Sequence, residues 1–222
     1  MRVLVTRPLD DARQTASLLE AAGHQPLLAP FMTVNFLDAA LPENVQGLVA
    51  TSANGVRGFC RLDARRGMPL FAVGSHTADV AREAGFNDVR ATDGDAAALT
   101  KAITDCAIAG TLLHLAGKDR GDVLAQNLPG LVSVTLYEAV AAAHFPADAR
   151  SALTDNKIDA ALFFSPRSAR IFGGCAAADG LSMGGVIAAC LSPAVADGLA
   201  GLSFREVRIA AQPSQKALIG LL

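Results

Sequence analysis

Hydroxyl-bearing and small residues recur where a predicted strand gives way to a predicted helix. The first N–H groups of a helix have no partner inside it, so they can hydrogen-bond a carboxylate or a phosphate of a ligand. Parallel α/β proteins bind their ligands at this end of the strands. The loops of this kind are Thr6-Arg7-Pro8, Thr51-Ser52-Ala53-Asn54, Gly74-Ser75-His76-Thr77, Gly117-Lys118, Ser165-Pro166-Arg167-Ser168, Ser192-Pro193 and Gln212-Pro213-Ser214. Together they predict that local donors bind an anion.

Each of these residues also has a purely structural interpretation. A serine or asparagine before a helix is first of all an N-cap, and Pro166 and Pro193 are ordinary helix-start residues. Arg7 and Arg167 more often form ion pairs between elements than clamp a substrate. His76 could donate a proton, or it could stand solvated in the first turn of a helix. The argument for a site therefore depends on how many such loops there are, and not on any single residue.

Fingerprints of nucleotide and cofactor binding are missing. The sequence contains neither Gly-x-Gly-x-x-Gly nor Gly-x-x-x-x-Gly-Lys-Ser/Thr. The cysteines form no Cys-x-x-Cys pair, and the histidines show no metal-ligand spacing. We therefore expect no structural metal and no support for dinucleotide or P-loop nucleotide binding, and we expect the cysteines to be free thiols in a reducing compartment.

Length and charge limit the remaining classes of protein. The chain has 222 residues, of which 51% are hydrophobic, so it can fill two cores of ordinary size. Its formal net charge is −2 and it has no basic run, which argues against nucleic acid as a partner. No apolar run has the length of a membrane span, and we expect no signal peptide, because the chain enters its first predicted strand without a basic region and an apolar stretch. We expect a cytoplasmic, monomeric protein that contacts no membrane.

Short β-rich runs alternate with helical ones along the whole chain. This alternation predicts parallel strands joined by right-handed crossovers, which is an open, doubly wound α/β fold. Strands are expected at 3–5, 25–29, 48–51, 70–73, 88–91, 112–115, 132–141, 160–164, 186–191 and 206–210. Helices are expected near 9–22, 55–62, 77–84, 96–107, 120–128, 147–153, 167–172, 194–199 and 214–222.

The sequence also nearly repeats itself, which predicts two copies of one α/β unit. The matching segments are 51–59 with 164–172, 78–79 with 196–197, 89–90 with 207–208 and, more weakly, 3–8 with 113–118. Two lobes that each present a row of helix N-termini suggest a cleft for a large anionic molecule.

Two stretches are candidate linkers between these lobes. Residues 33–41 carry few helix or strand signals and are followed by Pro42, and the extended stretch around Tyr137 is the second candidate. Linkers at these places would make the central part an inserted lobe, with both chain ends in the other lobe. The alternative is one lobe for each half of the sequence, and periodicity alone does not decide between them.

The ordered set of motifs resembles the uroporphyrinogen-III synthase family. Each motif is weak alone, but the set runs from end to end of the chain in the family's order, which makes it specific. The motifs are Leu4-Val-Thr-Arg-Pro8, Pro26-Leu-Leu-Ala-Pro30, Thr51-Ser-Ala-Asn-Gly-Val56, Ala72-Val-Gly-Ser-His-Thr-Ala78, Leu136-Tyr-Glu-Ala139, Phe163-Phe-Ser-Pro166 and Ala211-Gln-Pro-Ser214.

The resemblance implies two doubly wound parallel-sheet lobes, the second inserted in the first. Residues 1–34 and 142–222 would form the discontinuous first lobe, and residues 41–133 the inserted lobe. Residues 35–40 and 134–141 would be the two extended linkers that join them.

The resemblance also implies a lyase of tetrapyrrole (haem, sirohaem or cobalamin) biosynthesis. Such an enzyme cyclises linear hydroxymethylbilane to uroporphyrinogen III, with inversion of ring D and loss of water and with no cofactor. Loss of the hydroxyl gives an azafulvene, attack on the substituted carbon of ring D gives a spiro intermediate, and this fragments and recloses. Because unassisted cyclisation gives the unreversed isomer, positioning is the main catalytic task. A transient contact with hydroxymethylbilane synthase, which makes the substrate, is expected.

Site residues follow from the resemblance and the strand-end loops together. Tyr137 corresponds to the family's linker tyrosine, a candidate to assist departure of the hydroxyl, and Thr77 matches a threonine in a Gly-x-x-Thr-Ala loop. Val195 stands where relatives often carry a threonine, which leaves its backbone as the donor. The substrate-binding candidates are Thr6, Arg7, Thr51, Ser52, Asn54, Gly74, Ser75, His76, Gly117, Lys118, Ser165, Arg167, Ser168, Ser192, Ala194 and Val195.

Two other functions compete with the synthase. A non-catalytic, two-lobed binder of small polyanions, or an inactive relative of the synthase, is the main alternative, and the missing hydroxyl at Val195 leaves room for it. A phosphosugar or nucleotide enzyme on a similar fold ranks lower, because fold alone does not fix function and the phosphate fingerprints are missing.

Overall fold

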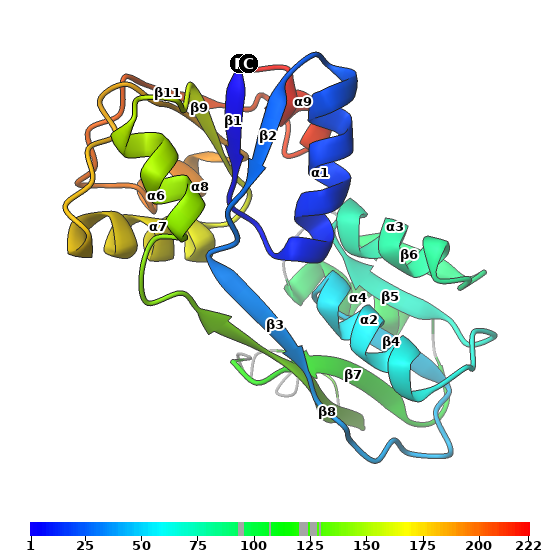
Figure 1. The fold of residues 1–222 in the computed structure, drawn as a ribbon. Helices are drawn as coiled ribbons and strands as arrows, with labels where there is room; N and C mark the ends of the chain where they lie inside the picture. The colour runs from blue at the N-terminus through cyan, green and yellow to red at the C-terminus, as the bar shows by residue number, and fades with distance from the viewer. Residues whose placement is uncertain (93–95, 107, 120–123, 125–127, 129) are drawn as a thin grey trace. The chain divides into compact units, whose positions relative to one another are not determined.

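The structure is a computed structural model that describes residues 1–92, 96–106, 108–119, 124, 128 and 130–222. The chain divides into two compact units (Figure 1). Unit 1 comprises residues 1–33 and 140–222, and unit 2 comprises residues 34–139. The predicted α/β fold with parallel sheets is confirmed. The predicted helix at 120–128 lies almost entirely outside the described residues, as does residue 107.

Unit 1 is built on a five-stranded sheet in the order β11-β10-β9-β1-β2, and each of its neighbouring strand pairs is parallel. The strands are β1 (Arg2–Val5), β2 (Gln25–Leu28), β9 (Ala160–Phe163), β10 (Ile187–Cys190) and β11 (Glu206–Ile209). The helices are α1 (Leu9–Ala21), α6 (Ala147–Thr154), α7 (Pro166–Ala178), α8 (Pro193–Asp197) and α9 (Gln215–Ile219).

The central strands of unit 1 are buried on both faces, which explains their uninterrupted apolar sequences. Val3 and Val5 belong to the core on the face that α1 and α9 cover. Leu4, which points the other way, packs with residues of α6, α7 and α8. A group of phenylalanines centred on Phe172 fills this second core with tilted and edge-to-face contacts.

Unit 2 contains a six-stranded sheet in the order β3-β8-β7-β4-β5-β6, to which β3 and β8 also bring residues of unit 1. The strands are β3 (Met32–Phe36), β4 (Gly47–Ala50), β5 (Leu70–Val73), β6 (Val89–Thr92), β7 (Leu112–Gly117) and β8 (Leu131–Ala141). The helices are α2 (Ala53–Leu62), α3 (Ser75–Glu83) and α4 (Ala96–Asp105). Residues of α2 and α3 pack in one core, and residues of α4 pack in the other.

The two sheets share one strand order once equivalent strands are matched. In unit 1, β1 lies between β2 and β9, and β10 and β11 follow; in unit 2, β7 lies between β8 and β4, and β5 and β6 follow. The segments that repeat in the sequence fall on these matching strands and on the helices that follow them. Unit 2 is therefore a circular permutation of unit 1 with β3 added at its edge, and both have the 2-1-3-4-5 order of flavodoxin-like sheets.

Three predicted elements differ from the structure. Residues 32–36 form β3, although 33–41 was expected to be an irregular linker; exposure alternates along the strand, and β8 supplies the partner that the local sequence does not reveal. α7 continues past Phe172 because Cys175 and Ala176 are buried in the core. α8 ends early because the next N–H groups bond carbonyls three residues back, which is a tighter 3₁₀ pattern.

Candidate functional site

The carboxyl ends of three parallel strands bring predicted site residues to one edge of the unit 2 sheet. Thr51 follows β4, Gly74 follows β5, and Gly117 ends β7. The register pairs Ala50 with Ala72 and Val49 with His114, so these strands end at nearly the same level. Tyr137 is the register partner of Gly117 on β8. This edge is where a doubly wound sheet binds ligands.

Tyr137 reaches Gly117 through an irregularity in the sheet. Register runs in step from Leu112 to Ala116, and then a β-bulge skips Leu136, so that Tyr137 lies opposite Gly117. Bulges re-aim side chains in this way. The Lys118 N–H donates to the Tyr137 carbonyl at 2.9 Å, which holds the two strands together beyond the bulge. The tyrosine side chain is half-buried.

Lys118 extends the same edge with a positive charge. Its Nζ donates to Glu138 Oε2 at 2.6 Å, and this hydrogen bond raises the pKa of Lys118 above its ordinary value. The lysine side chain is exposed, so it stays charged and accessible to an anion. Glu138 is a residue that sequence reasoning missed, although it follows the tyrosine directly.

The helix starts at this edge are capped differently. Ser52 Oγ accepts from the Asn54 N–H at 3.2 Å, and Asn54 Oδ1 accepts from Arg57. Gly74, with a φ of 77°, begins α3 without a side-chain cap. Ser75 is exposed, His76 is half-buried and the Thr77 side chain is buried. The backbone at the start of α3 is therefore the better anion donor of the two.

A buried histidine lies behind Thr51. His114 is 3% exposed, with its Nε2 3.5 Å from Thr51 Oγ1 and its Nδ1 3.2 Å from Ser133 Oγ. Sequence reasoning missed this histidine as a site residue; the signal was a single polar residue between two leucines of a buried strand. It links the strand-end hydroxyl of Thr51 to the interior of the sheet.

The end of β1 in unit 1 is closed instead of open. The Thr6 hydroxyl donates to the Leu162 carbonyl at 2.7 Å. Arg7 is 7% exposed, lies 3.1 Å from the Asp11 carboxylate, and stacks on Phe164 at 4.3 Å. These side chains hold unit 1 together, and the structural interpretation of Arg7 agrees with this geometry.

The other helix starts of unit 1 repeat the contrast between capped and uncapped ends. Ser165 Oγ accepts from the Ser168 N–H at 3.1 Å, whereas Ser192 makes no side-chain cap to α8. Val195 is 1% exposed, and its N–H donates to the Ser192 carbonyl at 3.1 Å. Ala194 is exposed at the same helix start. Arg167, in the first turn of α7, is half-buried.

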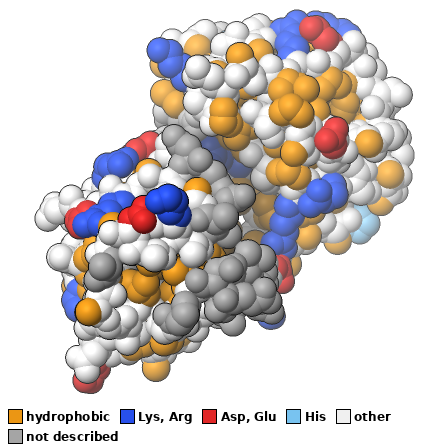
Figure 2. Space-filling view, turned by 180° about the vertical axis from the view of Figure 1, so that it is seen from behind, with side chains coloured by type: hydrophobic (Ala, Val, Ile, Leu, Met, Phe, Trp, Pro, Cys, Tyr) orange, Lys and Arg blue, Asp and Glu red, His pale blue; other side chains and the backbone are white. Residues whose placement is uncertain are grey.

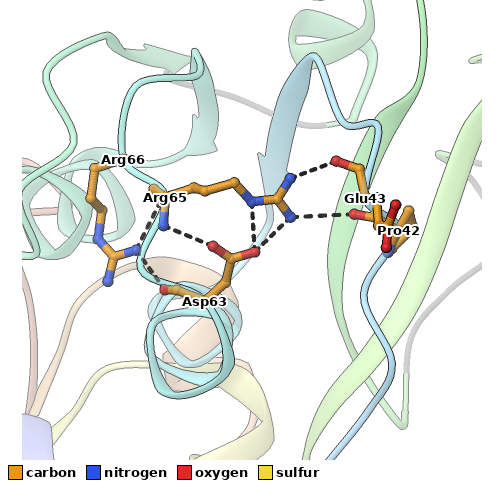
Figure 3. A network of polar contacts seen from close by, with 5 residues as sticks. All are labelled: Pro42, Glu43, Asp63, Arg65 and Arg66. Atoms are coloured by element: carbon orange, nitrogen blue, oxygen red, sulfur yellow. Dashed lines mark hydrogen bonds and ion pairs between the residues drawn. The ribbon is translucent and has the colours of Figure 1, made fainter.

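A pocket in unit 2 lies away from this edge. It has a volume of about 440 Å³ and is lined by residues at the far end of α2 and in the loop before β4. Arg65 closes it by donating to the Asp63 carboxylate and to the carbonyls of Pro42 and Glu43 (Figure 3). Hydrogen bonds from Arg65 hold the pKa of Asp63 below its ordinary range. Because these donors are occupied within the protein, we interpret the network as a clamp on the loop.

Other nucleophiles form no second site among the described residues. Residues 180–184 match Gly-x-Ser-x-Gly, a pattern that sequence reasoning overlooked, but they lead from a helix toward a strand, whereas a nucleophile elbow leads from a strand into a helix. Burial raises the pKa of the Cys190 thiol to about 11. No group of three His, Cys, Asp or Glu side chains in the described part of the chain could hold a metal ion.

Charge on the surface is mixed. On the face drawn in Figure 2, basic and acidic side chains lie among hydrophobic and uncharged ones. With a formal net charge of −2, attraction of an anion has to come from local donors. None of the described helices is long and apolar enough to cross a bilayer.

The fold and its strand-end loops define a doubly wound α/β protein with two related sheets. The chain belongs to the uroporphyrinogen-III synthase family: the family model described as uroporphyrinogen-III synthase HemD matches residues 13–220. A comparison with curated protein sequences gives no significant match.

Solved structures of this family have the same fold. Uroporphyrinogen-III synthetase from Helicobacter pylori is similar with 18% identity and a TM-score of 0.66, over 100% of this chain and 98% of that chain. A mutant uroporphyrinogen III synthase from Thermus thermophilus is similar with 20% identity and a TM-score of 0.56, over 100% of this chain and 97% of that chain.

Proposed function

We propose that this chain cyclises hydroxymethylbilane to uroporphyrinogen III, with inversion of ring D and loss of water, and so acts as a lyase. The observation that carries the proposal is the family match over residues 13–220, which takes in both units. The chemistry of the strand-end loops agrees with a substrate that bears many carboxylates.

The carboxyl edge of the unit 2 sheet supplies the reacting end of the site in this proposal. Tyr137 donates its phenolic proton to the departing hydroxyl of hydroxymethylbilane, which leaves as water; this gives an azafulvenium cation and a phenolate, and transfer of the pyrrole N–H proton to the phenolate gives the neutral azafulvene. The half-buried ring suits this role, because the strand beside it limits its movement while the residue keeps part of its surface exposed. Lys118 binds a substrate carboxylate beside Tyr137 through its charged ammonium group.

Backbone donors orient the chain for attack at the substituted carbon of ring D. In the first turn of α3, Ser75, His76 and Thr77 follow the uncapped Gly74. Since the Thr77 side chain is buried, we assign its contribution to the N–H group and not to the hydroxyl. At the start of α2 the Asn54 N–H is already bonded to Ser52, so we assign the contribution of Thr51, Ser52 and Asn54 to their side chains.

Unit 1 contributes further carboxylate binding. Ser165, Arg167 and Ser168 begin α7, and Ser192, Ala194 and Val195 begin α8. At Val195 only the backbone could take part, because the side chain is in the core, and a carboxylate would have to share or replace the N–H bond to the Ser192 carbonyl. In this proposal Thr6 and Arg7 stabilise the end of β1 and do not contact the substrate.

The proposal includes a monomeric, cytoplasmic protein without a metal or organic cofactor. It receives hydroxymethylbilane through transient contact with hydroxymethylbilane synthase. Fast transfer would matter because the free substrate cyclises to the type I isomer without assistance.

Analysis of the product isomers tests this function. Hydroxymethylbilane is generated freshly by its synthase in the presence of the protein, and the products are oxidised to porphyrins and separated by chromatography. We expect predominantly type III product, and only type I with heat-unfolded protein. Type I alone from protein that circular dichroism shows to be folded would overturn the proposal and favour the polyanion binder.

A further inference from the structure

We propose that Gly117 is a positioning residue, whose missing side chain forms the seat for the Tyr137 ring. The proposal rests on the function given above, since it assigns a role to Gly117 through Tyr137. It concerns how the phenol is held, and it adds to the carboxylate binding expected of the Gly117-Lys118 loop.

While the Tyr137 ring keeps its place, the contact is too close for any other residue at this position. A Cβ on Gly117 would lie 2.7 Å from Tyr137 Cζ, 2.8 Å from its Oη and 2.9 Å from its Cε2. Carbon atoms in contact are normally about 3.5–4.0 Å apart. The hydroxyl end of the phenol therefore occupies the space that a side chain on Gly117 would fill.

The backbone gives no other reason for a glycine here. Gly117 is not among the glycines with positive φ, so an alanine could adopt its conformation. Gly74, by contrast, needs its φ of 77°, and a Cβ there would meet nothing within 4 Å. Gly117 is thus required by its neighbour rather than by its own geometry.

The matching position in unit 1 carries a large residue. The repeat aligns Gly117 with Arg7, whose side chain fills the end of β1. A parallel strand of this fold therefore accepts a side chain at this point. The bulge that places Tyr137 opposite β7 lies in unit 2, and Gly117 is the residue that it pairs with Tyr137.

An added methyl group would displace the ring and leave the strand in place. β7 is hydrogen-bonded to β4 on one side and to β8 on the other, and the Lys118 N–H holds the Tyr137 carbonyl. The tyrosine side chain is only half-buried, so rotation about its side-chain bonds is the easier response. The hydroxyl then leaves its place at the edge of the sheet.

The composition of the chain offers a direct optical probe. Tyr137 is the only tyrosine, and the chain has no tryptophan. Tyrosine emission, and its quenching by iodide, therefore report on this ring alone. They read the position of the phenol without any reference to activity.

The test is Gly117→Ala, alone and combined with Tyr137→Ala. Gly67→Ala is the matched control, because Gly67 lies in the same unit and a Cβ there meets nothing within 4 Å. We expect Gly117→Ala to keep the far-ultraviolet spectrum, to change tyrosine emission and iodide quenching, and to lower kcat about tenfold with little change in KM. In the Tyr137→Ala background it should have no further effect, because nothing is left to displace.

Three results would overturn the proposal that Gly117 positions the Tyr137 ring. They are unchanged tyrosine emission in Gly117→Ala, wild-type kcat in that variant, and an equal loss of kcat in the Tyr137→Ala background. The last result would mean that Gly117 acts on the substrate or on the fold. If the wild-type protein makes only type I product, the proposed function fails, and the emission measurement still decides whether Gly117 seats the ring.

Discussion

The ends of β1 and β7 are equivalent in the two units, yet the chain uses them in opposite ways. After β1, Arg7 is buried against Asp11 and Phe164, and the Thr6 hydroxyl is bonded to a carbonyl. After β7, Gly117 has no side chain, Lys118 is exposed, and the half-buried Tyr137 ring lies on the strand.

This difference shows how one fold can serve two purposes in a single chain. The carboxyl edge of a doubly wound sheet is open by construction, and it can be filled by side chains or left for a ligand. In unit 1 a buried ion pair closes the edge beside β1. In unit 2 the strand has no side chain at this place, and the Tyr137 ring from the neighbouring strand lies there instead.

Replacing Arg7 should have the largest effect on stability. Arg7→Met keeps the length of the side chain but leaves the Asp11 carboxylate buried without its cation. We expect the free energy of unfolding to fall by about 3 kcal/mol. Urea denaturation followed by circular dichroism measures this. Lys118→Met, which removes an exposed charge, is the comparison. An equally small loss of stability in Arg7→Met would contradict a structural role for Arg7.

Gly55 offers the next test, at the contact between α2 and β7. A Cβ there would collide with the Leu115 carbonyl oxygen, which is backbone and cannot rotate away. We expect Gly55→Ala to cost about 2 kcal/mol by overpacking. The repeat places Ser168 at the matching position of α7, so Ser168→Ala is the control and should change stability less. Equal effects would mean that the two helices pack alike.

The two serines at the starts of α7 and α8 should differ in their contribution to stability, by less than the substitutions above. Ser165→Ala removes a side-chain bond to the Ser168 N–H, whereas Ser192 makes no such bond. We expect about 1 kcal/mol from the first substitution and a much smaller change from Ser192→Ala. Thermal unfolding of both variants at one protein concentration measures the difference. A larger loss in Ser192→Ala would show that it caps its helix in solution.

Lys118→Met should have the smallest effect on the fold. Its partner Glu138 is reached through an exposed ion pair, and such pairs contribute little to stability. We expect an unchanged midpoint of denaturation and a severalfold rise in KM, because a cation is lost from the substrate edge. Unchanged KM would remove Lys118 from the binding site.

The strands, most helices and the relation between the units could be predicted from the sequence. Short apolar runs such as Leu70–Val73 and Ala160–Phe163 are typical of parallel strands that are buried on both faces. The repeat places Ser52 and Ser165 at matching helix starts, and both do cap their helices. Such features are local, or they recur, so one sequence contains their signal.

The contacts that distinguish the two units could not be predicted. The bulge opposite Gly117, the seat under Tyr137 and the burial of Arg7 depend on register between strands distant in the chain. β3 was missed because its partner, β8, lies far along the sequence. An arginine or a glycine at a strand end looks the same in sequence, whether it faces a ligand or the core.

The most direct test of this account compares Arg7→Met with Tyr137→Phe in two measurements on each protein. One is the free energy of unfolding, and the other is the rate of type III product formation per folded molecule. We predict that Arg7→Met loses stability and retains its rate, while Tyr137→Phe keeps its stability and loses about tenfold in rate, below the ~10²–10⁴ that a dominant general acid provides. A wild-type rate in Tyr137→Phe, or a loss of rate in folded Arg7→Met, would contradict it.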